Sequence, residues 1–426
     1  MDPLEFVRQS GSVEQVQAAA QKGAAPSPRP SLNAHIHLPP NFSAFESVQQ
    51  AVDLAAGQGV RVLGAGNYYD FTVYQDFAAA AREQGIFPLF NTEIITLDKD
   101  LQQENIRVND PGNPGKIYIC GKAISEFVHP SPRAAELLAL IRKNDTLRMR
   151  EIIDKLAAHF RRHGLEMHLD DRAVIDRVVR RHGCRADRVT LQERHAAQAF
   201  QEVFFEKVPP EQRTETLAEL FGTAVKSAPN DAVGIQNEIR SHLMKAGKPC
   251  FVPETFITPA QARELILQLG GIPCYPVLAD GASPVCEYET PVGKLVDRLK
   301  ENRYPMVEFI PVRNSPQVLN EYAKAVRKAG IILTIGTEHN TLDLLPMEPA
   351  CLKGAAIPEE LKALFWEGTC VLAAHQFLSA HGRRGFVDAG GNPNPDCADT
   401  GERIEAFQKL GAAVIDAYFK IPKREG

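Results

Sequence analysis

Two histidines and two glutamates, far apart in the sequence, lie where short apolar segments end. His35 and His37 lie in AHIHL, Glu93 follows PLFNT, and Glu338 follows ILTIGT. Imidazole nitrogens and carboxylate oxygens are common ligands of divalent transition metals. The sequence therefore predicts a site for one divalent metal (Zn, Mn or Fe) built from these four side chains.

The spacing of the two histidines supports this prediction. Alternate side chains of a β-strand point to the same face, so His35 and His37 would face the same space. The structural alternatives are two histidines that only pack in the mouth of a barrel and a glutamate that caps a helix. His339 is an alternative ligand to its neighbour Glu338. Three more polar side chains follow strands and are candidates for orienting a ligand or holding a water: Asn67, Asp70 and Glu308.

These side chains need a scaffold that brings the ends of strands together. Short segments rich in Val, Ile and Leu alternate with helical patterns. Seven such segments lie at 32–38, 60–66, 86–92, 116–120, 272–278, 305–310 and 330–336. Repeated strand–helix units predict an α/β fold with a parallel sheet, and seven strands with a large insert predict a distorted β/α barrel. In such barrels the chemistry lies at the carboxyl ends of the strands.

The same patterns divide the chain into four regions. Residues 1–31 form an N-terminal extension and linker. The barrel is expected at 32–121 and 251–345, interrupted by an all-helical insert at 122–250. Helices at 346–426 extend the chain, and they could pack on the barrel or form a dimer contact. Residues 142–195 hold 14 Lys and Arg against 9 Asp and Glu, so the insert is locally basic. These cations could bind an anion, or they could pair with acidic neighbours on solvated helix faces.

Composition argues against several classes of protein. A net charge of −5 over 426 residues makes nucleic acid an unexpected partner. The eight cysteines are scattered without a CxxC pair, which argues against a zinc ribbon or a disulfide framework and fits a reducing compartment. The start MDPLEFVRQS has no hydrophobic signal core, and no run of about 18 apolar residues exists. We therefore expect a cytoplasmic protein with no membrane partner; the oligomeric state is left open.

Six segments follow one another in the order of a known family's motifs: AHIHL, VLGAGNYYDFTVYQDF, NTEI, IYICGK, ITPAQARELILQLGGIPCYPV and ILTIGTEHN. Between residues 32 and 340 the chain resembles the polymerase-and-histidinol-phosphatase (PHP) family of metal-dependent phosphoesterases. The resemblance implies a distorted seven-stranded barrel with up to three metals. The helical insert resembles that of the branch with nucleoside bisphosphate phosphatases and 5′–3′ exoribonucleases, where it covers the substrate.

The departures from the family pattern concern its metal ligands. Tyrosines replace three histidines, and a neutral tyrosine is a poor metal ligand because its pKa is about 10. Asn67 and Asn340 replace a further aspartate and histidine, and Glu338 replaces the closing aspartate. One family metal position maps to the two histidines and two glutamates named first, all of which can still bind. The resemblance therefore implies that a three-metal site has become a one-metal site.

Other side chains near the mapped site have candidate roles. The three tyrosines could donate hydrogen bonds to an oxyanion or act as acid or base, or they could fill space: Tyr68, Tyr118 and Tyr275. His339 and Asp70 are candidates for the general base. Asn67, Asn340 and Arg194 are candidates for substrate contacts, Arg194 because it resembles an element of the family's insert.

These observations predict a hydrolase in which a metal activates water against a small anionic substrate, phosphorylated or carboxylated. Phosphate esters are the substrate class that the resemblance implies. The loss of ligands leaves room for carbon–oxygen or carbon–nitrogen hydrolysis and for a one-metal isomerase or lyase of sugar acids. A binding module without turnover is the alternative from a different class.

Overall fold

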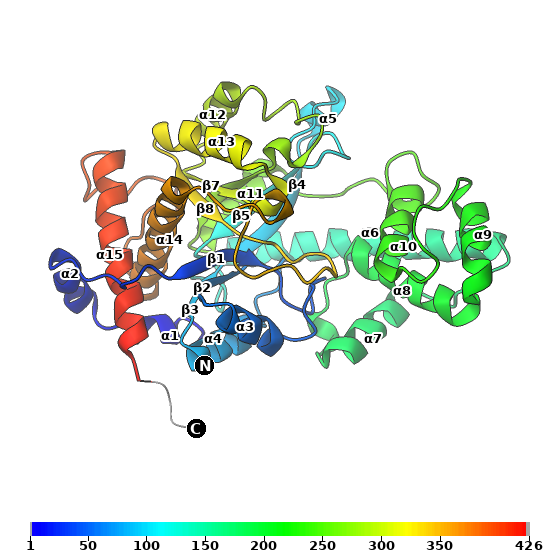
Figure 1. Cartoon of the computed structure of the whole chain (residues 1–426), viewed down its shortest axis with the longest axis horizontal. Coiled ribbons are helices and arrows are strands. Elements are labelled where there is room, and N and C mark those ends of the chain that lie inside the picture. Colours follow the sequence, from blue (N-terminus) through cyan, green and yellow to red (C-terminus); the bar gives the residue numbers. More distant parts are fainter. Residues whose placement is uncertain (1, 423–426) are drawn as a thin grey trace.

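The computed structural model describes residues 2–422 and has a mixed α/β architecture (Figure 1). The described strands form two sheets, and neither closes on itself. The first sheet has the order β1-β2-β3 and is parallel throughout: β1 (Ser31–Ile36), β2 (Val60–Ala65) and β3 (Phe87–Phe90). The second has the order of the chain: β4 (Thr92–Leu97), β5 (Lys116–Lys122), β6 (Ile272–Val277), β7 (Met306–Phe309) and β8 (Ile332–Ile335).

The observed sheets differ from the expected barrel in the number and direction of strands. The expected strand at 86–92 is two strands, because the strand is interrupted at Asn91: β3 before it pairs with β2, and β4 after it pairs with β5. β5 runs antiparallel to both β4 and β6, while β6, β7 and β8 are parallel. Single bridges from Ile36 to Glu338 and from Tyr68 to Glu93 connect the two sheets at their edges. A closed seven-stranded barrel is thus not what the described residues form.

Helices follow the strands of both sheets, as the repeated patterns predict. They are α3 (Val48–Gly57), α4 (Tyr74–Gln84), α5 (Lys99–Gln103), α11 (Pro259–Gln268), α12 (Val292–Glu301) and α13 (Pro316–Lys328). The Thr258 side chain caps α11 by accepting a hydrogen bond from the backbone of Gln261, and Pro259 begins the helix.

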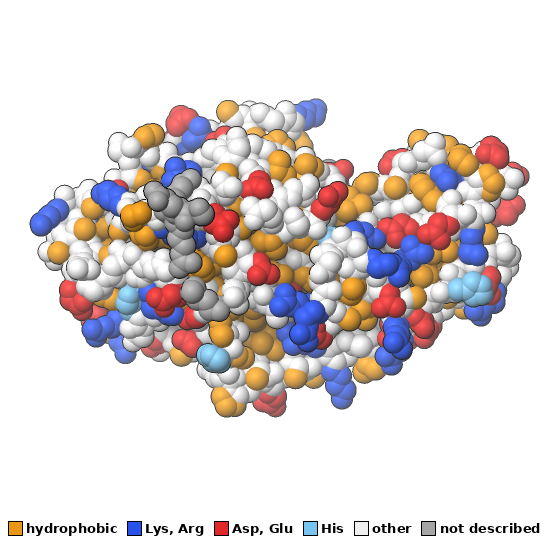
Figure 2. All heavy atoms as spheres, turned by 90° about the horizontal axis from the view of Figure 1, so that it is seen from below, with side chains coloured by type: hydrophobic (Ala, Val, Ile, Leu, Met, Phe, Trp, Pro, Cys, Tyr) orange, Lys and Arg blue, Asp and Glu red, His pale blue; other side chains and the backbone are white. Residues whose placement is uncertain are grey.

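The chain between β5 and α11 is helical and forms a lobe of its own (Figure 1). Its helices are α6 (Pro132–Arg162), α7 (Asp171–His182), α8 (Glu193–Lys207), α9 (Pro210–Phe221) and α10 (Ala232–Ile239). They bury a separate hydrophobic cluster that includes Leu156, Phe160, Phe200 and Phe204. In Figure 2 the lobe stands beside the larger body, with Lys and Arg side chains gathered where the two meet.

Several arginines of this lobe pair with acidic neighbours on the helix surfaces. Arg177 contacts Glu202 and Glu206, and Arg181 also contacts Glu202. The sequence left two roles open for the basic residues of the insert, anion binding and pairing with acidic neighbours, and these arginines have the second role.

The C-terminal helices pack on the body rather than standing apart from it. α14 (Glu359–Ala380) lies against β8, and α15 (Thr400–Lys420) packs on α14 and on α2 (Val13–Gln21). The short α1 (Glu5–Arg8) also contacts α14. A Cβ on Gly368 would come within 1.9 Å of the Leu333 carbonyl oxygen, so only glycine allows α14 this close to the sheet. No helix among the described residues has the length and apolar character needed to cross a membrane.

A candidate metal centre below a basic cavity

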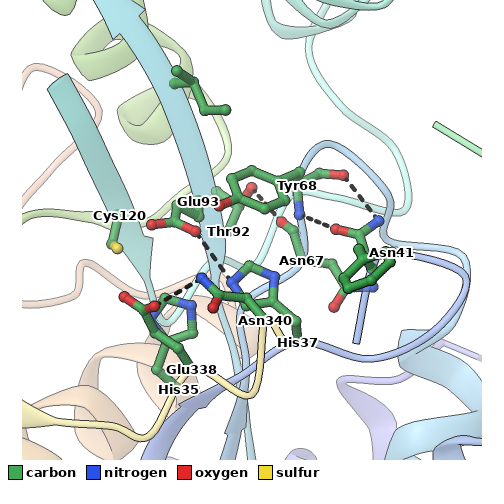
Figure 3. Close-up of polar contacts among 12 residues, drawn as sticks. His35, His37, Asn41, Asn67, Tyr68, Thr92, Glu93, Cys120, Glu338 and Asn340 are labelled. Atoms are coloured by element: carbon green, nitrogen blue, oxygen red, sulfur yellow. Dashed lines mark hydrogen bonds and ion pairs between the residues drawn. The ribbon is translucent and has the colours of Figure 1, made fainter. Parts of the chain in front are cut away.

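Three of the four predicted ligands converge where the two sheets meet (Figure 3). His35 lies in β1, His37 follows its end, and Glu93 is the second residue of β4. Each offers one ligand atom, and these atoms lie within 4.8 Å of one another. All three side chains are buried, with at most 2% of the residue surface exposed. Glu93 reaches this place through the bridge to Tyr68 rather than by ending a strand.

The ligand atoms of this group lack hydrogen-bond partners. They are His35 Nε2, both ring nitrogens of His37, and Glu93 Oε2. His37 Nε2 and Glu93 Oε2 are 3.1 Å apart, but without the alignment of a hydrogen bond. Buried polar atoms without partners are uncommon because desolvation is costly. Four of them in one place, with two imidazoles and a carboxylate, fit a divalent metal such as zinc, manganese or iron.

A contact to its Nδ1 fixes the orientation of the His35 ring. Its Nδ1 lies 2.6 Å from Oε2 of Glu308, which also forms an ion pair with Lys122. Burial would raise the pKa of Glu308, but its contacts with His35 and Lys122 lower it to about 2. A carboxylate that accepts the Nδ1 proton leaves Nε2 as the free ligand nitrogen of His35. Glu308, which the sequence predicted as an orienting residue, thus contacts a candidate ligand. Lys122 was not predicted from the sequence.

Two glycines make room for the His35 side chain. A Cβ on Gly66 would lie 2.6 Å from both Nε2 and Cδ2 of His35. A Cβ on Gly336 would lie 2.4 Å from the His35 Cβ. Any larger residue at either position would displace the His35 imidazole. The two glycines therefore contribute to the site by leaving space for this side chain.

Glu338, the fourth predicted ligand, does not join the group. Both of its carboxylate oxygens face the Arg313 guanidinium, with Oε1 3.0 Å from Nη1. Oε2 also accepts a hydrogen bond of 2.8 Å from Asn340. Glu338 and His339 both have left-handed backbone conformations (φ of 61° and 51°), which are strained for such residues. Glu338 is therefore not among the side chains whose ligand atoms lie within 4.8 Å of one another, and the structure groups three of the four predicted ligands.

The three candidate tyrosines are separated in the structure. The Tyr68 ring stacks on His37, with 4.8 Å between the ring centres. Tyr68 and Tyr118 both line a cavity that lies above the metal group and is described below. Burial, together with the charge of Glu93, raises the pKa of Tyr68 well above its usual value, so its hydroxyl stays a donor. Tyr275 does not line this cavity, and its hydroxyl donates to Glu289 Oε1 at 2.8 Å.

His339, a candidate general base, has no free ring nitrogen. Its Nδ1 lies 2.7 Å from the Thr337 hydroxyl oxygen, and its Nε2 lies 2.9 Å from the Leu345 carbonyl oxygen. Its ring also stacks on Phe45. These contacts fix the loop after β8, and they leave the imidazole without an atom that could take a proton from a substrate.

Asp70 and Asn67, the other candidates after β2, are likewise engaged in local structure. One Asp70 oxygen accepts hydrogen bonds from the backbone and hydroxyl of Thr72. The Asn67 amide donates to the carbonyl and accepts from the amide of Leu38, both at 2.8 Å. Neither side chain lines the cavity above the metal group, so the structure brings neither to the predicted site.

A cavity of about 490 Å³ lies between the strand ends and the helical lobe. Glu93, Tyr68 and Tyr118 line it from the body, and α6 and the start of α8 line it from the lobe. Six cationic side chains line it: Lys116, Arg148, Arg194, Arg240, Lys245 and Arg313. The helical insert thus covers the metal group and supplies four of these six cations.

Most of these cations have an acidic partner. Glu193 lies 2.8 Å from Arg148 and 3.2 Å from Lys245, and Arg240 also faces it. Lys116 pairs with Asp110. Arg194 is the one lining cation for which no ion pair is found among the described residues. Its guanidinium lies 5.8 Å from the Phe42 ring centre, and burial together with Arg240 lowers its pKa to about 10, so it stays charged at neutral pH.

The chain matches no family model and no curated protein. Two solved structures share its fold. One, assigned as a metal-dependent phosphoesterase from Bifidobacterium adolescentis, is 13% identical, with a TM-score of 0.50 over 80% of this chain and 96% of the other. The second, an amidohydrolase from Chromobacterium violaceum with bound sulfate and no metal, is 15% identical, with a TM-score of 0.51 over 78% and 96%. The chain therefore has a fold found among metal-dependent hydrolases.

Proposed function

We propose that this protein is a metal-dependent hydrolase of the PHP type that acts on a small anionic substrate. Three buried side chains with unpartnered ligand atoms, below a cavity lined by six cations, are the observation that carries this proposal. A divalent ion held by His35, His37 and Glu93 would supply Lewis acidity for the activation of water. The motif resemblance and the fold of the two neighbours support the assignment to a PHP-type hydrolase.

The chain's own residues divide the remaining tasks. Arg194 is charged but has no acidic partner among the described residues. Its guanidinium, with several N–H donors in one plane, is suited to bind an anionic group of the substrate. Tyr68 and Tyr118 keep their protons and can donate hydrogen bonds to a developing oxyanion. The helical lobe covers one side of the cavity, and a substrate that displaces water there would strengthen each of these interactions.

Phosphate esters are the first substrate class, since Arg194, which lines the cavity without an acidic partner among the described residues, suits a phosphate group. Hydrolysis of a carbon–nitrogen bond in a carboxylated substrate is the second. Two observations favour this second class: the amidohydrolase among the fold neighbours, and a ligand group of three, which suits one ion better than a cluster.

The test combines metal analysis with activity. Purified wild type, His37→Ala and a control, His163→Ala at the end of α6 and outside the cavity lining, are assayed on phosphate esters, carboxylic esters and amides with Mn²⁺ or Zn²⁺. We expect one ion per chain and metal-dependent turnover in wild type and the control, and loss of both in His37→Ala. Metal binding without turnover would favour a binding module, and full turnover in His37→Ala would move the active site elsewhere.

A further inference from the structure

The buried interior holds a second group of side chains that could bind a metal. His35, Cys120 and Glu308 each offer a ligand atom within 4.8 Å of the others. This group shares His35 with the group of His37 and Glu93, and all of its members are buried. A thiolate, an imidazole and a carboxylate form a donor set that zinc or cobalt would accept. The two groups therefore compete for His35 and for an ion.

Lys122 lies beside the second group and contacts its carboxylate. Its Nζ contacts Glu308 Oε1, and both side chains are fully buried. The other carboxylate oxygen, Oε2, accepts the proton of His35 Nδ1 at 2.6 Å and lies 3.6 Å from the Cys120 sulfur. The oxygens of Glu308 are thus engaged, one by an ammonium group and one by the imidazole.

We propose that Lys122 is a positioning residue that acts as a built-in cation and sets the number of metal ions at one. Its ammonium group occupies the carboxylate of the second group and keeps Cys120 from binding an ion. It also holds Glu308 as the acceptor for His35 Nδ1, so that His35 offers only Nε2 to the first group. This inference rests on the proposed metal-dependent function and adds to it the residue that determines metal count.

Electrostatics in the interior support this role. An ammonium group and a divalent ion near the same carboxylate would repel each other strongly, because little water is present to screen them. A buried ion pair is also poor evidence for stability, since well-packed apolar residues often stabilise a core equally well. The charges of Lys122 and Glu308 are better explained by the orientation that they impose on His35.

Cobalt provides a probe that distinguishes the two groups. Co²⁺ bound to a thiolate gives an intense near-ultraviolet charge-transfer band, which imidazole and carboxylate ligands do not give. Wild type, Lys122→Met, Lys122→Met with Cys120→Ser, and Lys116→Met are titrated with Co²⁺. Lys116→Met is a matched control, because Lys116 is a buried lysine on the same face of β5 with its own acidic partner, Asp110.

We expect wild type and Lys116→Met to bind one Co²⁺ without the thiolate band. In Lys122→Met we expect the band to appear, and to disappear again with Cys120→Ser. The affinity of the first group should also fall by about 10- to 100-fold, the usual effect of removing a residue that orients a ligand.

The outcomes separate this inference from the proposed function. A thiolate band or two bound ions in wild type would overturn the inference but leave a metal protein, and this measurement does not depend on the folding of any variant. A folded Lys122→Met that titrates like wild type would overturn it as well. No bound Co²⁺ or Zn²⁺ in wild type would overturn the proposed function and the inference with it.

Discussion

The substitution Gly66→Ala tests whether His35 Nε2 is the atom that faces a metal. The added Cβ would lie 2.6 Å from His35 Nε2 and Cδ2, where an ordinary contact is at least 3.4 Å. The imidazole would have to move by about 0.8 Å. It cannot easily do so, because Glu308 holds Nδ1 at 2.6 Å and the backbone at Gly336 touches the His35 Cβ from another side.

This displacement is large on the scale that a metal site tolerates. Ligand distances in metal sites are kept to within about 0.2 Å, so a shift several times larger removes His35 as a ligand. Disturbing even an outer contact of a ligand costs about 10- to 100-fold in affinity, so we expect a loss of at least 100-fold, or about 2.7 kcal/mol. The overpacked core should also lose about 1–3 kcal/mol of stability.

The assay is competition with a chelator for Zn²⁺, together with urea unfolding of the metal-free protein. Gly57→Ala is the matched control, because Gly57 lies in α3 and a Cβ there would meet nothing within 4 Å. We expect that variant to bind metal like wild type and to be equally stable or up to about 1 kcal/mol more stable. A folded Gly66→Ala with wild-type affinity would refute the reasoning, since Nε2 could not then be the ligand atom.

Three further predictions concern the cavity and its supports. Arg194→Met should raise the KM for an anionic substrate at least about 10-fold, since a charged hydrogen bond contributes about 1.5–3 kcal/mol; an unchanged KM would remove Arg194 from the binding site. His339→Ala should lower the free energy of unfolding by about 1–3 kcal/mol in urea without loss of metal, whereas lost turnover at full stability would restore it as a base. Burial raises the pKa of Glu289 to about 7, so its proton binds more tightly in the folded state, and stability is fully present below about pH 4.5 and lost as pH rises through 7. Urea unfolding should show wild type losing about 3 kcal/mol relative to Glu289→Gln between pH 4.5 and 8, and parallel pH profiles would contradict this.

The sequence could predict what depends on neighbours within one element. His35 and His37 face the same space because alternation within a strand is a local property. Their ring centres are 5.0 Å apart. Helices between residues 132 and 244 were predictable for the same reason, since their periodicity is local. Glu93 lies at the predicted site for a different reason than the one predicted. It belongs to β4, which is antiparallel to β5, and the apolar pattern did not distinguish β4 from β3.

The partner of Glu338 could not be predicted in this way. Arg313 comes 25 residues earlier in the chain, in the turn after β7, and its guanidinium reaches Glu338 because β7 and β8 are parallel neighbours with aligned ends. A sequence shows that a carboxylate follows a strand, but whether it meets a metal or an arginine depends on which strand ends become neighbours. Residue type alone therefore could not show that Glu338 pairs with Arg313.

β5 did carry a signal for the residue that was missed. Lys116, Tyr118, Cys120 and Lys122 alternate with Ile117 and Ile119, a pattern typical of a strand with one face in water. Here both faces are mostly buried, because the polar face looks into the space that the two sheets and the helical lobe enclose. Glu308, in the apolar segment MVEF, requires a cation nearby because an isolated buried carboxylate is unstable. An alternating strand with an inward lysine can supply that cation, and β5 is such a strand.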